Sequence, residues 1–408
     1  MAKREYKLSH LMDNVFQQAV SHHQRGGIDK AINLYKRVVA RDPNNKSAWL
    51  NLAAALRSQK KFKGSWVCYQ RAIVLAEDDP DLWSNYGNLL VEMERFDEAD
   101  EAHQKALSLS GITARRLYNA GLSPFYSNRP VLALRYFDQV LEMKPDYHEC
   151  VWNKSLALLQ LGNLTDGFNF HEVRWRLPKT IQRSMQKKRW RGESLEGRRV
   201  LVIAEQGYGD MIQFSRFTGT LVRRGATVIL EARAALLPLM RCLKGVSEVI
   251  EKEQPYENYD YYIPLISIPS EIGLSTEDLS YYPYQFSLPK RKERDLTTGN
   301  KLFKVGIVWA GKLSPRDRSC PLRLLLPLLA HSDVQFFSFQ VDKRVNDLVE
   351  EGVDGLVMDL SPNINNFLDS ASYMQKMDLF ITIDSAPAHL AGALGVPVWA
   401  LLLHHSDW

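Results

Sequence analysis

Two stretches of the sequence place residues that could carry chemistry directly after an apolar run. The first is G207-Y208-G209-D210, which follows the β-branched run 200–205 and precedes an amphipathic stretch at 211–224. Glycines such as Gly207 and Gly209 in a strand-to-helix turn let a ligand approach the backbone, whose N–H groups can donate to it. Asp210 has two interpretations here, because an aspartate at this place acts either as a helix cap or as a proton acceptor.

The second stretch covers residues 384–397, DSAPAHLAGALGVP. Asp384 ends an apolar run that is typical of a buried strand, and Pro387 suits the first turn of a helix. His389 then lies in that first turn, where a ligand at the helix N-terminus could reach it. In the alternative interpretation, Asp384 or Ser385 caps the helix and His389 is a residue of the helix surface.

Both stretches belong to a half of the chain in which apolar, β-branched runs alternate with amphipathic ones. We expect strands at 200–205, 227–232, 248–250 and 259–265, and, after an interruption at 281–301, at 304–311, 334–340, 378–384 and 397–403. This alternation predicts two Rossmann-like halves with parallel sheets, residues 199–290 and 291–408. Ligands of such sheets bind at the carboxyl ends of the strands, which is where both stretches lie.

The first half of the chain repeats with a period of 34 residues. A small residue and, four positions later, a ring recur at this spacing: Ala31, Ser65, Ala99 and Ala133, with Tyr35, Tyr69, His103 and Phe137. The pattern resembles the tetratricopeptide repeat and predicts an α-solenoid of about five units over residues 1–178. Asn51, Asn85 and Asn119 share the period, and they either hold an extended peptide through their amides or lie in solvent.

Composition excludes several classes of protein. The net charge of +5 over 408 residues is too small to indicate a nucleic-acid partner. Four scattered cysteines without a C-x-x-C pair indicate neither a zinc site nor a disulfide framework, and they fit a reducing compartment. The N-terminus lacks the apolar region of a signal peptide, and no apolar run approaches the length of a membrane span. We therefore expect a cytoplasmic protein with no transmembrane segment.

A basic linker is expected between the repeats and the first Rossmann-like half, at residues 179–198. Its arginines and lysines are opposed by two glutamates only, Glu193 and Glu196. Such a run either binds a phosphate-bearing substrate or an anionic surface, or is a solvated connection.

Three segments in order resemble glycosyltransferase family 9: residues 205–214 (EQGYGDMIQF), 305–311 (VGIVWAG) and 383–398 (IDSAPAHLAGALGVPV). With the repeats, the chain is similar to bacterial proteins that join tetratricopeptide repeats to a domain like the ADP-heptose:lipopolysaccharide heptosyltransferases. The resemblance implies a GT-B fold, with the acceptor on the first Rossmann-like half and a nucleotide-diphospho-sugar donor on the second. It also implies inversion at the anomeric carbon without a metal ion or other cofactor. The α/β half contains no D-x-D motif and no clustered His and Cys that would hold a metal.

The resemblance also implies roles for single residues. Asp210 would be the base that takes the acceptor proton, after the turn formed by Gly207 and Gly209. On the donor side, Asp384 would bind the sugar, with Ser385 and His389 facing the diphosphate. Arg318 would stabilise the departing diphosphate together with the helix N-terminus that follows.

The expected function is thus glycosyl transfer, of a hexose or heptose, to a protein or glycan acceptor that the repeats recruit. Two alternatives stay open: a repeat-based interaction scaffold with an inactive transferase-like domain, and a protein O-glycosyltransferase resembling O-GlcNAc transferase. The repeat groove would bind a peptide or protein, or a second copy of the chain. Because the family continues beyond the last strand expected here, we expect the second Rossmann-like half to be incomplete and the chain to be a fragment.

Overall fold

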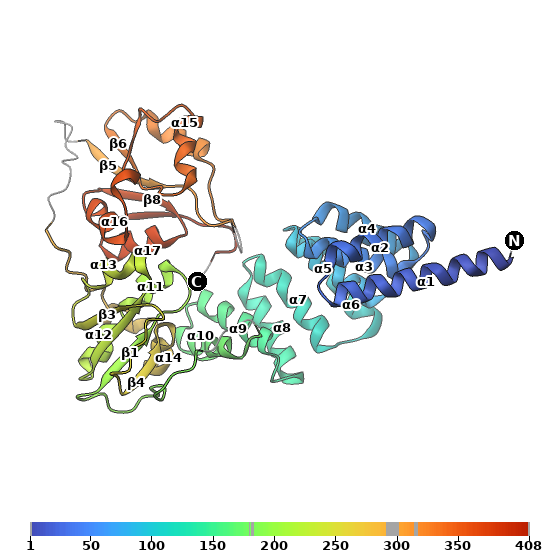
Figure 1. Ribbon diagram of the computed structural model, residues 1–408, viewed down its shortest axis with the longest axis horizontal. Helices are drawn as coiled ribbons and strands as arrows, with labels where there is room; N and C mark the ends of the chain where they lie inside the picture. The colour runs from blue at the N-terminus through green and yellow to red at the C-terminus, as the bar shows by residue number, and fades with distance from the viewer. Residues whose placement is uncertain (1, 179, 181–182, 291–301, 314–316, 407–408) are drawn as a thin grey trace. The chain divides into compact units, whose positions relative to one another are not determined.

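The computed structural model describes residues 2–178, 180, 183–290, 302–313 and 317–406 (Figure 1). These residues form two compact units. One unit comprises the residues up to 162 together with 173–178, and the other comprises 163–172 and the residues from 180 onward. The expected junction between the two Rossmann-like halves, at residues 290 and 291, and the expected start of the basic linker at 179 fall at or beyond the edge of the described residues.

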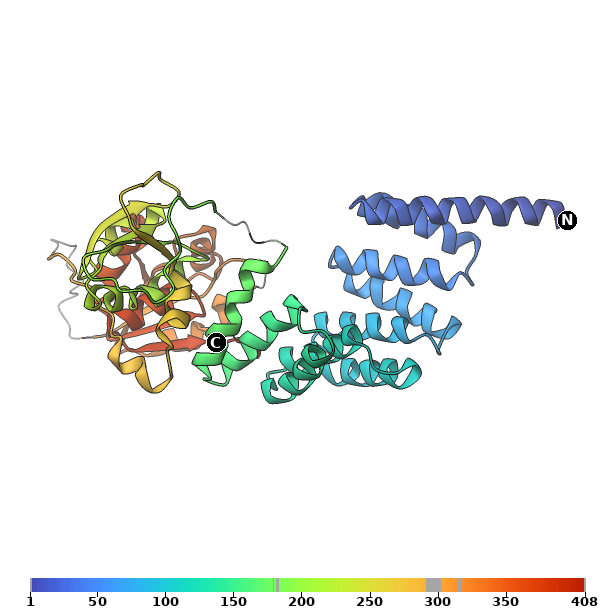
Figure 2. The ribbon, with the colours of Figure 1, turned by 90° about the horizontal axis from the view of Figure 1, so that it is seen from below.

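The first unit is all-helical and consists of helices that pack as successive antiparallel pairs (Figure 2). Its helices are α1 (Ala2–Gln24), α2 (Ile28–Arg41), α3 (Lys46–Ser58), α4 (Phe62–Leu75), α5 (Pro80–Glu92), α6 (Phe96–Ser110), α7 (Ala114–Tyr126), α8 (Pro130–Met143) and α9 (His148–Gln160). Each helix contacts the next one along the chain. The predicted tetratricopeptide-repeat solenoid is therefore confirmed.

The residues that carry the 34-residue period form the core of this unit. The small residues at positions 31, 65, 99 and 133 have no exposed surface, and the rings at 35, 69, 103 and 137 are at most 1% exposed. Glycine is required opposite two of these rings. A Cβ on Gly87 would lie 2.6 Å from the His103 ring, and one on Gly121 would lie 2.7 Å from the Phe137 ring. The close approach of paired helices thus depends on these small residues.

The asparagines with the same period are not all available to a ligand. Asn119 is buried, and its amide donates to Ser84 Oγ in the preceding repeat at 2.9 Å. Asn153, one period later, donates to the Tyr118 hydroxyl at 3.0 Å. Both alternatives proposed for Asn119, a peptide contact and a solvated position, are therefore wrong, because its side chain joins two neighbouring repeats.

The second unit contains two sheets in which all neighbouring strands are parallel. The first sheet has the order β3-β2-β1-β4, with β1 (Arg199–Ile203), β2 (Thr227–Ala232), β3 (Val246–Glu251) and β4 (Tyr261–Pro264). The second has the order β7-β6-β5-β8-β9, with β5 (Phe303–Val308), β6 (Val334–Ser338), β7 (Val357–Asp359), β8 (Leu379–Ile383) and β9 (Val398–Leu401). A parallel-sheet α/β region is therefore confirmed.

The helices of this unit are short, and all except α10, which precedes β1, lie between strands. They are α10 (Leu164–His171), α11 (Tyr208–Ser215), α12 (Thr218–Arg223), α13 (Leu237–Met240), α14 (Ile268–Ile272), α15 (Asp347–Glu350), α16 (Phe367–Met374) and α17 (Ala386–Ala393). Helix α10 packs on α14, and its Phe168 ring contacts Phe214 of α11 with the ring centroids 5.8 Å apart.

Three arginines of the basic linker form ion pairs with glutamates of this unit. Arg183 Nη1 lies 2.6 Å from the buried Glu231 Oε1. Arg189 forms ion pairs with both Glu172 and Glu271, and Arg191 pairs with Glu271 at 2.8 Å. For Arg183 and Arg189 the expected solvated connection is wrong, because the chain itself supplies their anions, whereas Arg191 is paired and still 59% exposed.

We predict that His103→Phe stabilises the helical unit, and that it does so more at pH 5 than at pH 7. Neither ring nitrogen of the buried His103 has a hydrogen-bond partner within the described residues, and burial lowers its pKa from 6.5 to about 4. Between these two pH values the unfolded chain binds a proton that the folded chain does not, so stability falls as the pH falls. Thermal unfolding followed by circular dichroism at both pH values measures the effect.

The reciprocal variant, Phe137→His, serves as the control because Phe137 holds the same position one period later. It should unfold at a lower temperature than the wild type, with a larger loss at pH 5. Equal melting temperatures of the wild type and His103→Phe at both pH values would show that the buried His103 does not destabilise the helical unit.

Candidate functional site

The first candidate stretch forms the start of α11, directly after β1. Gly207 precedes the first helical residue, and its N–H donates to Asp210 Oδ2 at 2.8 Å. Asp210 therefore caps the helix with one oxygen, as the structural interpretation of this residue requires. Its other oxygen makes no hydrogen bond within the part of the chain that the structure describes, and the side chain is half-buried.

The second candidate stretch forms the start of α17, directly after β8. Ser385 occupies the N-cap position, but its hydroxyl donates back to the Ile383 carbonyl at 3.2 Å and does not cap the helix. Arg318 reaches this strand end from the loop after β5. Its Nη1 lies 2.9 Å from Asp384 Oδ2 and 3.2 Å from the Asp384 carbonyl oxygen. The structure thus brings Arg318 and Asp384 together as an ion pair, with the Asp384 side chain 16% exposed.

The starts of α11 and α17 pack against each other, between the two sheets (Figure 1). A Cβ on Gly209 would lie 2.8 Å from Cδ2 of His389 and 3.5 Å from the Ala386 Cα. Beside this contact, the Tyr208 ring packs on Phe367 of α16 with centroids 5.1 Å apart. Two stretches that are more than 170 residues apart in the sequence therefore lie at one place, and His389 belongs to the contact.

Sequence reasoning missed Arg233, which directly follows β2 at the same edge of the first sheet. Its Nη2 donates to the Gln206 carbonyl oxygen at 2.6 Å, and its guanidinium lies 5.7 Å from the centre of the Tyr208 ring. Gln206 has a φ of 45°, a conformation that costs energy for a residue other than glycine. Arg233 thus holds the turn that leads into Asp210. The rule that located the two candidate stretches, a polar residue directly after a strand, would also have found it.

A buried carboxylate lies behind this turn. Glu231 has no exposed surface, and its Oε2 accepts a hydrogen bond from the Ala204 N–H at 3.2 Å. Burial raises the pKa of Glu231, whereas the hydrogen bond and charge of Arg183 act in the opposite direction. The pair fixes the carboxyl ends of β1 and β2 relative to the basic linker.

The arrangement suits an anionic ligand between two helix starts. Each helix start carries the positive end of its helix dipole, and the guanidiniums of Arg318 and Arg233 lie at the carboxyl ends of strands of the two sheets. The Asp210 and Asp384 carboxylates can accept protons or hydrogen bonds from hydroxyl groups. Among the residues that the structure describes, no three His, Cys, Asp or Glu side chains are grouped so that they could hold a metal ion.

Models of two known families match the chain. The tetratricopeptide-repeat family matches residues 16–80, 80–112 and 118–167. Glycosyltransferase family 9 (heptosyltransferase) matches residues 332–406. The second match contains Asp384, Ser385 and His389, whereas Asp210 and Arg318 lie outside it.

Curated and solved relatives are similar to different parts of the chain. Protein FlbA of Caulobacter vibrioides is 21% identical, and the match covers 93% of this chain and 80% of FlbA. The human protein O-mannosyl-transferase TMTC3 is 27% identical over 30% of this chain, which corresponds to 14% of TMTC3. The solved structure of Pseudomonas aeruginosa pilF is 20% identical in sequence, with a TM-score of 0.38. The match covers 43% of this chain and 79% of the pilF chain.

No helix within the described ranges is long and apolar enough to cross a membrane. The repeat matches cover helices of the first unit and part of α10, and the family 9 match covers β6 to β9 of the second sheet. The chain therefore combines tetratricopeptide repeats with a glycosyltransferase family 9 domain.

Proposed function

We propose that this protein is a metal-independent, inverting glycosyltransferase whose two parallel sheets form a GT-B pair. The observation that carries the proposal is the packing of α11 on α17, which brings Asp210 near the strand end that holds Asp384. In this arrangement the acceptor binds on the side of the first sheet and a nucleotide-diphospho-sugar on the side of the second. The family 9 match supports the second assignment, because it contains the start of α17.

On the acceptor side, Asp210 acts as the base. The acceptor hydroxyl attacks the anomeric carbon, Asp210 takes its proton, and the bond between that carbon and the diphosphate oxygen breaks. The diphosphate leaves with the bonding electron pair, and attack from the opposite face inverts the configuration. The cap that Asp210 forms with Gly207 orients the carboxylate and uses one oxygen only, which leaves the other for the proton.

On the donor side, Arg318 and the positive end of the α17 helix dipole stabilise the negative charge that develops on the diphosphate. Ser385 and His389 lie at the same helix start and face the diphosphate in this proposal. The Asp384 carboxylate binds hydroxyl groups of the sugar. Its ion pair with Arg318 fixes the guanidinium before the donor arrives, since Arg318 is also bound to the Asp384 carbonyl.

The repeats would bring the acceptor to this site. Tetratricopeptide repeats indicate binding of a protein or peptide, and a second copy of the chain is another partner of this kind. A protein acceptor is favoured by the name of the human relative, a protein O-mannosyl-transferase. The interaction scaffold without catalysis is the alternative, and binding of nucleotide-sugars separates the two.

Calorimetric titration with a panel of UDP-, GDP-, ADP- and dTDP-sugars identifies the donor, and the Asp384 and Arg318 variants then test the site. Asp384→Ala should weaken binding of the nucleotide-sugar about ten- to hundred-fold, because it removes a charged hydrogen-bond partner of the sugar. The same variant should bind the free nucleotide diphosphate as well as the wild type or better, since Arg318 loses an internal anion but keeps its bond to the residue 384 carbonyl. Arg318→Ala should weaken both ligands.

Equal losses for both ligands in Asp384→Ala would remove this residue from the sugar site. Failure of the wild type to bind any member of the panel would instead favour the scaffold.

Asp210→Asn should lower turnover of the identified donor about 10²- to 10⁴-fold with donor affinity nearly unchanged. The asparagine oxygen can still accept the Gly207 N–H, so the helix start is preserved while the base is lost. Asp166→Asn is the matched control, because Asp166 is the third residue of α10 and is exposed. Turnover of Asp210→Asn equal to that of Asp166→Asn would reduce Asp210 to a helix cap.

A further inference from the structure

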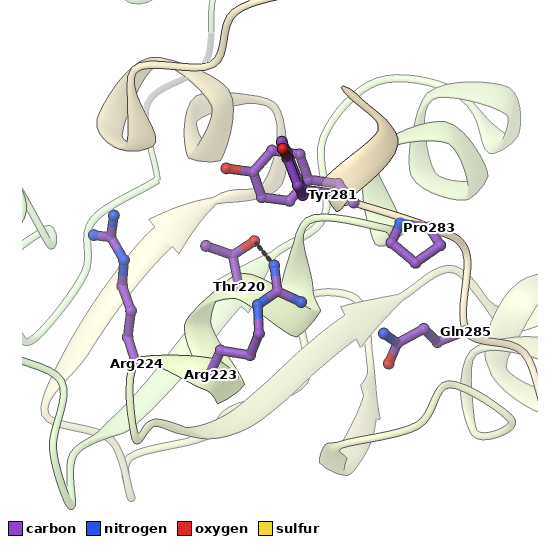
Figure 3. Close-up of a pocket in the computed structure, with 7 residues that line it drawn as sticks. Thr220, Arg223, Arg224, Tyr281, Pro283 and Gln285 are labelled. Atoms are coloured by element: carbon purple, nitrogen blue, oxygen red, sulfur yellow. Dashed lines mark hydrogen bonds between the residues drawn. The ribbon is translucent and has the colours of Figure 1, made fainter. Parts of the chain in front are cut away.

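An open cavity lies at the C-terminal end of α12, in the unit that holds the two sheets (Figure 3). Thr220, Arg223 and Arg224 line it from the helix end, and Tyr281 and Gln285 line it from a later segment. Arg224 comes three residues before β2 begins, so the cavity lies at the amino end of the first sheet. The proposed transfer site lies at the carboxyl ends of the strands, so this cavity has no role in it.

The arginines around this cavity are held by neutral groups. Arg223 donates to Thr220 Oγ1 at 3.1 Å, and Arg224 lies 5.4 Å from the centre of the Trp190 ring. Below them, Arg216 donates to two backbone carbonyls, those of Tyr282 and Leu279. Hydroxyls, rings and carbonyls fix a guanidinium without cancelling its charge.

No carboxylate pairs with these three arginines within the described residues. Glu196 lies beside the helix end, where its Oε2 would clash with a Cβ on Gly225, but it forms no ion pair with Arg223 or Arg224 within the described residues. Arg223 and Arg224 are both exposed, so their charge faces the cavity and solvent. An anionic group at either guanidinium would form charge-assisted hydrogen bonds, and Arg presents donors in a fork that matches a carboxylate or a phosphate.

The opposite wall offers an aromatic surface. Tyr281 lines the cavity and is 71% exposed, whereas the neighbouring Tyr282 ring lies 5.7 Å from the Arg223 guanidinium (Figure 3). An exposed tyrosine ring can cover the apolar C–H face of a sugar, while the Gln285 amide and the Thr220 hydroxyl can bond sugar hydroxyl groups. A few polar groups around an aromatic surface are the usual composition of a small-molecule site.

We infer that this cavity binds an acidic saccharide, with acid groups at Arg223 and at Arg224 and a sugar ring on Tyr281. A phosphate or another small anion would contact only the arginines and would leave Tyr281 and Gln285 unused. A neutral sugar would use the ring and the amide but not the charges. The acidic saccharide is the ligand class that uses every group of the cavity, and its binding does not depend on the transfer reaction.

The test is calorimetric titration of the wild-type protein with trigalacturonate, with a neutral trisaccharide of galactose and with inorganic phosphate. We expect the strongest binding for trigalacturonate. Arg223→Gln and Arg224→Gln should each weaken it about ten- to hundred-fold, the usual effect of losing a charged hydrogen bond. Tyr281→Ala should weaken it about ten-fold, and all three residues are exposed, so the fold should be retained. Arg323→Gln, which removes an exposed arginine beside the second sheet, is the control for net charge and should change nothing.

Four results would overturn the inference. Equal affinity for phosphate and trigalacturonate, with no effect of Tyr281→Ala, would leave an anion site only. Equal affinity for the neutral and acidic trisaccharides would exclude a role of the arginines. Absence of trigalacturonate binding, or a loss in Arg323→Gln as large as in the two cavity arginines, would exclude the site. Thermal unfolding of each variant shows whether a loss of binding reflects loss of the fold.

Discussion

The missing side chain of Gly209 is the constraint on which the candidate site depends. It lets the first turn of α11 lie directly on α17, with the His389 ring where a Cβ would otherwise be. Both helices follow strands of different sheets, so this single contact joins the carboxyl ends of β1 and β8. Neither helix is long, and each is positioned by its strand and by this packing more than by its own propensity.

The arginines of this unit differ in the groups that bind them. At the helix starts, Asp384 and Arg318 neutralise each other, and Arg233 is bound to a carbonyl oxygen. In the basic linker, glutamates from distant parts of the chain neutralise the arginines. At the end of α12 the guanidiniums of Arg223 and Arg224 are held by a hydroxyl and a ring. The same residue type is therefore structural at one place and available to a ligand at another, and the partner decides which.

The sequence predicted those features that depend on regular spacing or on local order. The 34-residue period located the solenoid, and the alternation of apolar runs located eight of the strands, but the three-residue β7 (Val357–Asp359) is too short to show a period. Features that depend on distant partners were not predictable. The partner of Arg183 is 48 residues away and that of Arg189 is 82 residues away, and no local pattern connects them. The spacing of Asn119 was visible, but its burial follows from the stacking of neighbouring repeats.

The most direct test of whether the packing of α11 on α17 forms the site is the turnover of the nucleotide-sugar donor by Gly209→Ala, compared with Gly219→Ala. A Cβ at Gly209 would lie 2.8 Å from the His389 ring, whereas the nearest atom to a Cβ at Gly219 lies at 3.6 Å, an ordinary contact. We expect Gly209→Ala to separate the two helix starts and to lose most of its turnover, while Gly219→Ala keeps its turnover. Equal turnover in the two variants would show that the packing of α11 on α17 does not form the site.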